Sequence, residues 1–327
     1  MIGDDVMKIG FFSSSTPITA ISPERFARAK KFLKSKGCTL VAGDLTGRKD
    51  CYRAGSIKQR ATEINQLIHD ETIDVLMATI GGLNTNSILK YIDFDYLQAH
   101  PKIIVGYSDT TAFLLAVYTQ APACRVLYGP ALVASFGEFS PLVDYTWTSF
   151  EQIIDNPTNI TMTAPQFWTD EQLNWDNFTQ PKKLISNHWG YTQASTLEGK
   201  IVGGNLDTMS GIIGSKYFPK FSANDLLLIE DAEKDAAIVE KNFAMLDNLG
   251  VFDQVKGIIL GKHASFDDLK TQRRPIDILL GILGPRPIPV IYDYDSCHTV
   301  PMMTTPLGSY AKFNAKTMQV SFSKYSI

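Results

Sequence analysis

The sequence has few cysteines, no long apolar run and no basic stripe, and each absence argues against a class of protein. Four cysteines occur in 327 residues, far apart and without C-x-x-C spacing, which argues against a disulfide framework or a zinc site. No apolar run approaches the ~20 residues of a membrane-spanning helix. With a net charge of −3 and no basic stripe, nucleic acid is not an expected partner.

The N-terminal stretch MIGDDVMKIGFF has two acidic residues and no basic segment before its short apolar run, so no signal peptide is expected there. The hydrophobic content of 44% and the charged content of 20% are typical of a globular protein with a real core. We therefore expect a cytoplasmic protein that has no membrane partner.

Strand-like and helix-like segments alternate through the first part of the chain. Short apolar runs predict strands at Met7 to Phe12, Thr39 to Ala42, Asp74 to Ile80 and Ile103 to Val105, with periodic helical segments between them. This alternation predicts an α/β fold, with a parallel sheet and helices on both faces. Ligands of such sheets bind beyond the C-terminal strand ends, where Gly81-Gly82 and Ser108 lie.

Residues 156–195 are polar and aromatic, with Trp168, Trp175 and Trp189 and little helical period. An ordered loop of this length is usually functional, although tryptophans can also simply anchor a loop to the surface. The predicted division is an N-terminal α/β domain over 1–155, a linker and active-site loop over 156–195, and a C-terminal domain of mixed strands and helices over 196–327. The last two strands of that domain are expected to be antiparallel.

Three residues of catalytic type lie at predicted strand ends. Ser108 sits between a strand and a helix, Glu230 directly follows the apolar run LLLI, and His298 lies in the loop after a predicted strand over 289–292. A Ser–acid–His relay needs side chains from distant segments on rigid supports, and this chain order is that of α/β-hydrolases. Simpler interpretations exist for each residue: Ser108 as a helix cap, Glu230 as a surface partner of Lys234, and His298 as a structural histidine.

Seven segments carry a resemblance to a known family. In chain order they are ATIGGLNTNSIL, KIIVGYSDTTAFL, YGPALVASFGEF, GKIVGGNLDT, LLLIEDAEKDAAIVEKNF, GIILGKHASFDD and DSCHTVPMMTTPLG. Together they resemble the L,D-carboxypeptidase family of serine peptidases, and more closely its microcin C self-immunity branch. The resemblance covers nearly the whole chain, and the motifs are specific in their order and spacing.

The resemblance implies a catalytic triad of Ser108, Glu230 and His298, and an oxyanion hole formed by the backbone N–H groups of Asp109 and Gly82. It also implies an N-terminal α/β domain, a C-terminal domain with a β-barrel-like core, and a homodimer. The chemistry that it implies needs no metal or organic cofactor.

Substrate-binding residues also follow from the resemblance. In the immunity branch a tryptophan-bearing loop and a lysine after the catalytic glutamate help to hold a nucleotide-like substrate, and Trp175 and Lys234 look equivalent here. Gly81, beside the implied oxyanion hole, is assigned to the same set. One position departs from the branch, which tends to have a neutral residue where this chain has Asp207. A carboxylate there is expected to repel a phosphate.

We therefore expect a serine hydrolase that cleaves an amide next to a carboxylate-bearing amino acid in a small peptide or peptidyl-nucleotide. The first hypothesis is release of the aminoacyl group from a microcin C type nucleotide, a self-protection and antibiotic-resistance activity. The alternative is removal of the terminal D-alanine from cell-wall tetrapeptides. The segment 166–190 favours the first and Asp207 weakens it. A non-catalytic two-lobed binding protein would keep the pocket without needing Ser108, Glu230 and His298 together.

Overall fold

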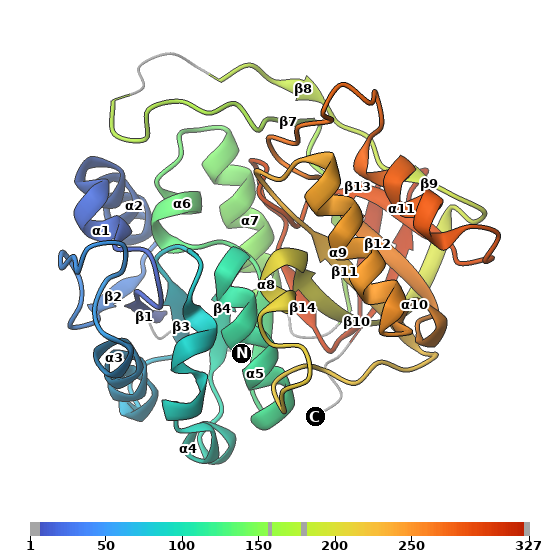
Figure 1. Cartoon of the computed structure of the whole chain (residues 1–327). Helices are drawn as coiled ribbons and strands as arrows, with labels where there is room; N and C mark the ends of the chain where they lie inside the picture. The colour runs from blue at the N-terminus through green and yellow to red at the C-terminus, as the bar shows by residue number, and fades with distance from the viewer. Residues whose placement is uncertain (1–6, 156–158, 178–181, 324–327) are drawn as a thin grey trace.

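The chain is built on two large sheets, one from each half, as the computed structural model shows for residues 7–155, 159–177 and 182–323 (Figure 1). Six strands form the first sheet and eight form the second, and a separate two-stranded ribbon joins β7 (Phe167–Trp168) to β8 (Ile185–Ser186). Within the described ranges, no helix has the length and apolar character needed to cross a membrane.

The six-stranded sheet confirms the predicted parallel α/β architecture. Its strands are β1 (Lys8–Phe12), β2 (Thr39–Ala42), β3 (Val75–Ala78), β4 (Ile103–Gly106), β5 (Arg125–Tyr128) and β14 (Thr305–Leu307), in the order β14-β5-β4-β3-β1-β2. The first five are parallel, and β14 adds an antiparallel edge from the far end of the chain. Every residue of β3 and β4 is buried, because helices cover both faces of the sheet.

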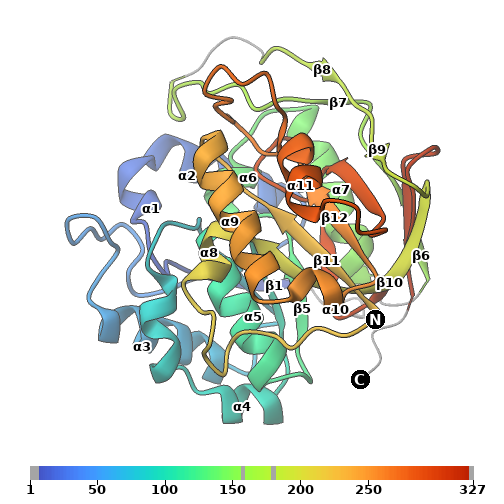
Figure 2. The same cartoon turned by 45° about the vertical axis from the view of Figure 1, so that its right-hand side comes forward.

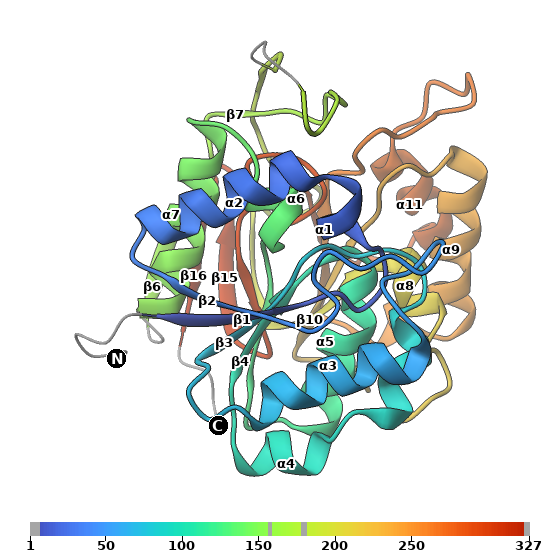
Figure 3. The ribbon, with the colours of Figure 1, turned by 90° about the vertical axis from the view of Figure 1, so that its left-hand side faces the viewer.

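Two layers of helices cover this sheet (Figure 3). One layer consists of α1 (Ile18–Ile21), α2 (Pro23–Ser35), α6 (Leu132–Phe136) and α7 (Leu142–Asp155). The other consists of α3 (Ile57–His69), the 3-10 helix η1 (Thr85–Tyr91), α4 (Phe94–Ala99) and α5 (Thr111–Gln120). The helix expected after Ser108 is preceded by a 3-10 turn, η2 (Ser108–Thr110), which leads into α5. Residues 111 to 117 of α5 are all buried, since α5 also packs against the second sheet.

The eight-stranded sheet is mixed, as expected for the second domain. In order across the sheet, its strands are β6 (Ile160–Thr163), β16 (Gln319–Phe322), β15 (Tyr310–Asn314), β10 (Thr196–Asn205), β11 (Asp225–Glu230), β12 (Gly257–Gly261), β13 (Val290–Tyr294) and β9 (Gly190–Tyr191). The strands from β10 to β13 are parallel, and β15 and β16 form the predicted antiparallel end. Over the described residues the strand order has two edges, β6 and β9, so the sheet does not close into a barrel.

Helices connect the parallel strands of the second sheet. They are α8 (Leu206–Ser210), α9 (Ala236–Asn248), α10 (Val251–Gln254) and α11 (Pro275–Leu283). The last three lie over one face of β11 and β12 (Figure 2). The segment predicted as a linker contributes strands β6 and β9 to this sheet, while β14 crosses to the first sheet. The domain boundaries at 155 and 196 stay a prediction, as does the homodimer.

Asp109 ties together two loops at the C-terminal edge of the first sheet. Its buried carboxylate, in the η2 turn that follows β4, accepts hydrogen bonds from the backbone N–H groups of Asn84 and Thr85, each at 2.9 Å. The Thr85 hydroxyl adds a third bond at 2.7 Å. Because Asn84 and Thr85 follow β3, this carboxylate fixes the loop after β3 against the loop after β4.

We expect Asp109→Ala to lower the free energy of unfolding by about 2 kcal/mol, because the buried Thr85 N–H loses its acceptor, while the Asn84 N–H and the Thr85 hydroxyl keep only their contacts with Ser15 and Ser14. Urea denaturation monitored by circular dichroism measures the change. Asp95→Ala, which removes an exposed carboxylate from the first turn of α4, is the matched control and should cost less than about 1 kcal/mol. Equal small losses for both variants would contradict the role of the Asp109 carboxylate.

Candidate active site

Ser108 adopts an unusual backbone conformation directly after β4. Its φ is +60°, in the left-handed region that residues with a side chain seldom occupy. It is the first residue of η2, whose N-cap position is held by Tyr107 with no side-chain capping bond. The alternative that Ser108 serves only as a helix cap is therefore wrong. A strained turn between a strand and a helix is the arrangement that presents the nucleophile in α/β-hydrolases.

Two glycines lie in the loop after β3, and neither position tolerates a larger residue. A Cβ on Gly81 would lie 2.7 Å from Ser108 Cβ and 2.9 Å from the Asp109 nitrogen. Gly82 has a φ of +145°, and a Cβ there would lie 2.2 Å from Ser15 Oγ. The backbone after β3 therefore lies against the Ser108 turn, which is what an oxyanion hole shared by the two loops requires.

Glu230 and His298 are in direct contact, although 68 residues separate them in the chain. Glu230 ends β11 with its side chain fully buried, and its Oε2 lies 2.6 Å from His298 Nδ1. This contact rules out the alternative in which Glu230 pairs with Lys234 on the surface. A carboxylate acceptor at Nδ1 keeps the proton on that nitrogen and leaves Nε2 as the ring's acceptor.

The pKa values of this pair move apart because each group stabilises the charged form of the other. Burial alone would raise the pKa of Glu230, but the His298 imidazole and the hydrogen bonds to the carboxylate lower it overall. Burial alone would lower the pKa of His298, but the Glu230 carboxylate raises it overall. Glu230 therefore stays ionised, and His298 takes up a proton more readily than an ordinary histidine.

Two further residues hold Glu230, and the sequence did not single them out. Its Oε1 accepts hydrogen bonds from the Tyr128 hydroxyl at 2.5 Å and from Asn205 Nδ2 at 3.0 Å. The Tyr128 hydroxyl also accepts a long bond of 3.4 Å from the Ser108 N–H. Tyr128 and Asn205 lie within two of the segments that carry the family resemblance, YGPALVASFGEF and GKIVGGNLDT, and both end strands. Their position as the last residues of strand segments was the available signal.

A cavity of about 590 Å³ collects most of the predicted site residues. Those that line it are Gly82, Ser108, Asp109, Trp175, Asp207, Lys234 and His298. Glu230 lies behind His298, and Gly81 packs against Ser108. In the described part of the chain, no hydrogen bond joins the Ser108 hydroxyl to His298. Such contacts are often loose before substrate binds, and the assignment of these residues as a triad stays a prediction.

Asp207 and Lys234 form an ion pair at the cavity wall, with 2.8 Å between Asp207 Oδ2 and Lys234 Nζ. Burial alone would lower the pKa of Lys234, but Asp207 and the neighbouring carboxylates raise it overall. From the sequence alone, the Asp207 carboxylate was expected to repel a phosphate. In the folded protein its charge is balanced by the lysine that was expected to bind substrate.

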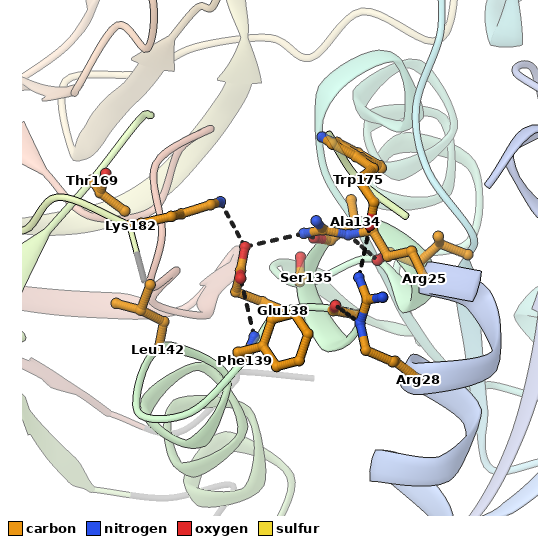
Figure 4. A network of polar contacts seen from close by, with 12 residues as sticks. Arg25, Arg28, Ala134, Ser135, Glu138, Phe139, Leu142, Thr169, Trp175 and Lys182 are labelled. Atoms are coloured by element: carbon orange, nitrogen blue, oxygen red, sulfur yellow. Dashed lines mark hydrogen bonds and ion pairs between the residues drawn. The ribbon is translucent and has the colours of Figure 1, made fainter. Parts of the chain in front are cut away.

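Trp175 reaches the cavity from a loop that is fastened to the first domain (Figure 4). Its backbone oxygen accepts a hydrogen bond of 2.7 Å from Arg28, and the Arg25 guanidinium lies 4.3 Å from the centre of its ring. Farther along the loop, Lys182 forms a 2.6 Å ion pair with Glu138. Trp189 is buried elsewhere, where it donates to Asp295 at 2.7 Å. Of these two tryptophans, Trp189 acts as an anchor and Trp175 lines the cavity.

Among the described residues, no group of three or more histidine, cysteine, aspartate or glutamate side chains is arranged to hold a metal ion.

Comparison with known proteins assigns both halves of the chain to one family. Residues 9–129 match the LD-carboxypeptidase N-terminal domain, and residues 198–313 match the LD-carboxypeptidase C-terminal domain. A carboxypeptidase-named protein of Vibrio cholerae is 50% identical, over 94% of this chain and 91% of its own length. The microcin C7 self-immunity protein MccF of Escherichia coli is 46% identical, over 92% of this chain and 88% of its own length.

Solved structures of MccF share the fold. A variant bound to adenosine monophosphate has a TM-score of 0.94 and 44% identity, with 98% of this chain and 97% of that chain covered. A complex of MccF with aspartyl sulfamoyl adenosine also has a TM-score of 0.94 and 44% identity, with 98% and 96% covered. The chain therefore belongs to the LD-carboxypeptidase family, and it is a serine-type carboxypeptidase or amidohydrolase.

Proposed function

We propose that this enzyme hydrolyses the amide bond between a carboxylate-bearing amino acid and a nucleotide, as a microcin-immunity hydrolase. In this proposal Ser108 is the nucleophile, His298 the general base and Glu230 its orienting acid. The observation that carries the proposal is the 2.6 Å contact between Glu230 and His298 at the wall of a cavity that Ser108 also lines.

The first chemical step forms an acyl-enzyme. The Ser108 oxygen attacks the carbonyl carbon of the amide while His298 Nε2 takes the hydroxyl proton. Negative charge develops on the carbonyl oxygen, and the backbone N–H groups of Asp109 and Gly82 stabilise it. The C–N bond then breaks, and the protonated His298 gives its proton to the leaving nitrogen. Water attacks the ester in the second step with His298 again as the base, which releases the amino acid and restores Ser108.

The nucleotide part of the proposal rests on the cavity and on a relative. A volume of about 590 Å³ lies within the range of pockets that hold drug-sized ligands. Trp175 offers an aromatic face in the cavity wall on which a base can stack. MccF is named as a microcin C7 self-immunity protein, and its solved complexes include nucleotide-like ligands.

The second candidate is removal of the terminal D-alanine from cell-wall tetrapeptides, and one observation favours it. Lys234, the expected partner of a phosphate, already has Asp207 as its counter-ion at 2.8 Å. A phosphate has to compete with that carboxylate, whereas a peptide substrate does not. The family's description as LD-carboxypeptidase is consistent with this candidate.

We expect Ser108→Ala to reduce hydrolysis by roughly 10⁴-fold or more while the fold stays intact. His298→Ala alone should cost about as much as the double variant with Ser108→Ala, because the two residues act in one step. Ser210→Ala, which removes another hydroxyl from the cavity wall, is the matched control and should stay within tenfold of wild type. Steady-state assays measure all four variants. Losses that simply multiply in the double variant would show that Ser108 and His298 do not work together.

The pH profile tests the Glu230–His298 pair. Since the neutral imidazole is the base, kcat/KM should fall as pH drops through the His298 pKa, which Glu230 holds above its ordinary value of ~6.5. Glu230→Gln removes the negative charge, so the acidic limb should move to lower pH while the plateau falls. Burial and the Glu230 charge raise the pKa of neighbouring Asp231 to about 7, so Asp231 titrates in the same pH range as His298. Both pH profiles, with Glu230 and with Glu230→Gln, are therefore measured in the Asp231→Asn background. If the acidic limb of the kcat/KM profile stayed at the same pH after Glu230→Gln, Glu230 would not be the group that raises the pKa of His298.

Substrate choice is tested with two variants and two substrates. Trp175→Ala should raise KM for an aminoacyl-nucleotide by roughly ten- to a hundredfold, because base–aromatic stacking is lost, and should barely affect a muropeptide tetrapeptide. Asp207→Asn should free Lys234 and improve turnover of the nucleotide, more strongly at low salt where charges are less screened. Equal losses on both substrates for Trp175→Ala, without any response to Asp207→Asn, would favour the cell-wall carboxypeptidase.

A further inference from the structure

Arg25, in helix α2, is a buried arginine whose guanidinium is held in one orientation. The residue is only 2% exposed. Its Nε donates to the Val133 carbonyl at 3.1 Å, and its Nη2 donates to the Ala134 carbonyl at 2.7 Å. The same Nη2 lies 3.2 Å from Glu138 Oε2. Three acceptors on one short stretch of chain thus fix the plane of the guanidinium (Figure 4).

The Trp175 ring rests on this guanidinium. The Arg25 Cζ lies 4.3 Å from the ring centre, within the range of a cation–π contact. The backbone around Trp175 is held by the same helix: the Arg25 N–H donates to Asp176 Oδ1 at 3.0 Å, and Arg28 Nη2 donates to the Trp175 carbonyl at 2.7 Å. Helix α2 therefore fixes both the backbone position and the ring of Trp175.

Contacts on either side of Trp175 reduce the freedom of the segment further. After it, Lys182 Nζ lies 2.6 Å from Glu138 Oε2, the oxygen that Arg25 also contacts. Before it, Asp170 Oδ2 accepts a 2.9 Å hydrogen bond from the Ser265 N–H, which belongs to the second half of the chain. The segment that carries Trp175 is thus tied to both halves of the molecule, while the cation–π contact with the ring itself comes from Arg25.

Trp175 lines the cavity but Arg25 does not. The guanidinium lies over one face of the ring, and Trp175 as a whole contributes to the cavity wall. We propose that Arg25 is a positioning residue that holds Trp175 as a preformed platform for a planar heteroaromatic base. The preference of the enzyme for base-bearing substrates then depends on this contact. The inference rests on the proposed function, because it assumes a substrate that carries a base.

The chemistry of arginine suits this role better than that of lysine. A guanidinium is planar and stacks on an aromatic face, while its edge donates to several acceptors at once. A lysine ammonium at the same position keeps the charge opposite Glu138 but can neither stack nor reach all three acceptors. Because a ring that is already fixed need not be ordered when the ligand arrives, the preformed platform favours binding.

The test measures adenosine affinity by isothermal titration calorimetry, with the full chain and without turnover. We expect Arg25→Lys and Arg25→Met each to weaken adenosine binding by roughly tenfold, and Trp175→Ala to weaken it by roughly ten- to a hundredfold. If Arg25 acts through Trp175, the double variant Arg25→Lys, Trp175→Ala should bind no more weakly than Trp175→Ala alone. If Arg25 had a merely structural role, the double variant would bind adenosine more weakly than Trp175→Ala alone.

Three controls make the result specific. Lys31→Met removes an exposed positive charge from the same helix and should leave adenosine binding unchanged. Adenosine monophosphate is titrated beside adenosine: if Arg25 acted by attracting the phosphate, only the monophosphate would lose affinity. Asp176→Ala removes the acceptor of the Arg25 N–H and loosens the same segment without removing a buried charge. If the Arg25 variants unfold, the adenosine affinity of Asp176→Ala tests whether the fixed position of Trp175 matters. This variant should weaken adenosine binding severalfold with little change in melting temperature.

The outcomes separate this inference from the proposed function. If the wild-type protein binds neither adenosine nor its monophosphate, the nucleotide function fails and the inference fails with it. If the wild type binds and Trp175→Ala weakens binding, while the Arg25 and Asp176 variants bind like wild type, only the inference fails. The inference is supported if Arg25→Lys weakens adenosine binding in the wild-type protein but not when Trp175→Ala is already present.

Discussion

The buried carboxylate of Glu230 joins the two halves of this enzyme. It receives hydrogen bonds from Tyr128 at the end of β5, from Asn205 at the end of β10, and from His298 in the loop after β13. A carboxylate removed from water is costly unless such partners surround it. Here those partners come from both sheets, so the group that orients His298 also requires that the two sheets meet at their C-terminal strand ends.

This constraint links the fold to the site. Parallel strands deliver their following loops to one edge of a sheet, and both sheets direct that edge toward the same cavity. Asp109 fixes the loops after β3 and β4 to one another, and Tyr128 contacts both the Ser108 N–H and Glu230. The Ser108 turn and the Glu230–His298 pair are therefore connected by a short chain of hydrogen bonds through Tyr128.

The sequence predicted the architecture well because hydrophobic periodicity is a local signal. Alternating apolar runs and helical segments identified the parallel sheet, and the antiparallel last strands were recognised. The helix expected after Ser108 is preceded by a 3-10 turn, in which Ser108 itself has a strained backbone. A strain of this kind depends on Gly81 packing alongside, which no local pattern encodes.

The candidate site was only partly accessible from the sequence. Ser108, Glu230 and His298 drew attention because their chemistry is recognisable and because they follow strands. Tyr128, Asn205 and Arg25 did not, since a phenol, an amide and a helical arginine acquire significance only through partners distant in the chain. Lys234 was considered as a partner of Glu230, whereas the fold pairs it with Asp207.

Two separate features of the cavity determine which substrate suits it. In the proposed function, Trp175 would stack on the planar part of a ligand, and the Asp207–Lys234 pair would meet its charge. The ion pair is partly exposed, with side-chain exposures of 35% for Asp207 and 22% for Lys234, and pairs of that kind are weak. A phosphate can therefore displace Asp207 from Lys234 at small cost, but the displaced carboxylate remains nearby and repels it. In the proposed function, Asp207 would lower the affinity for a phosphate while Trp175 stays available to the base, so base recognition and charge recognition could change independently.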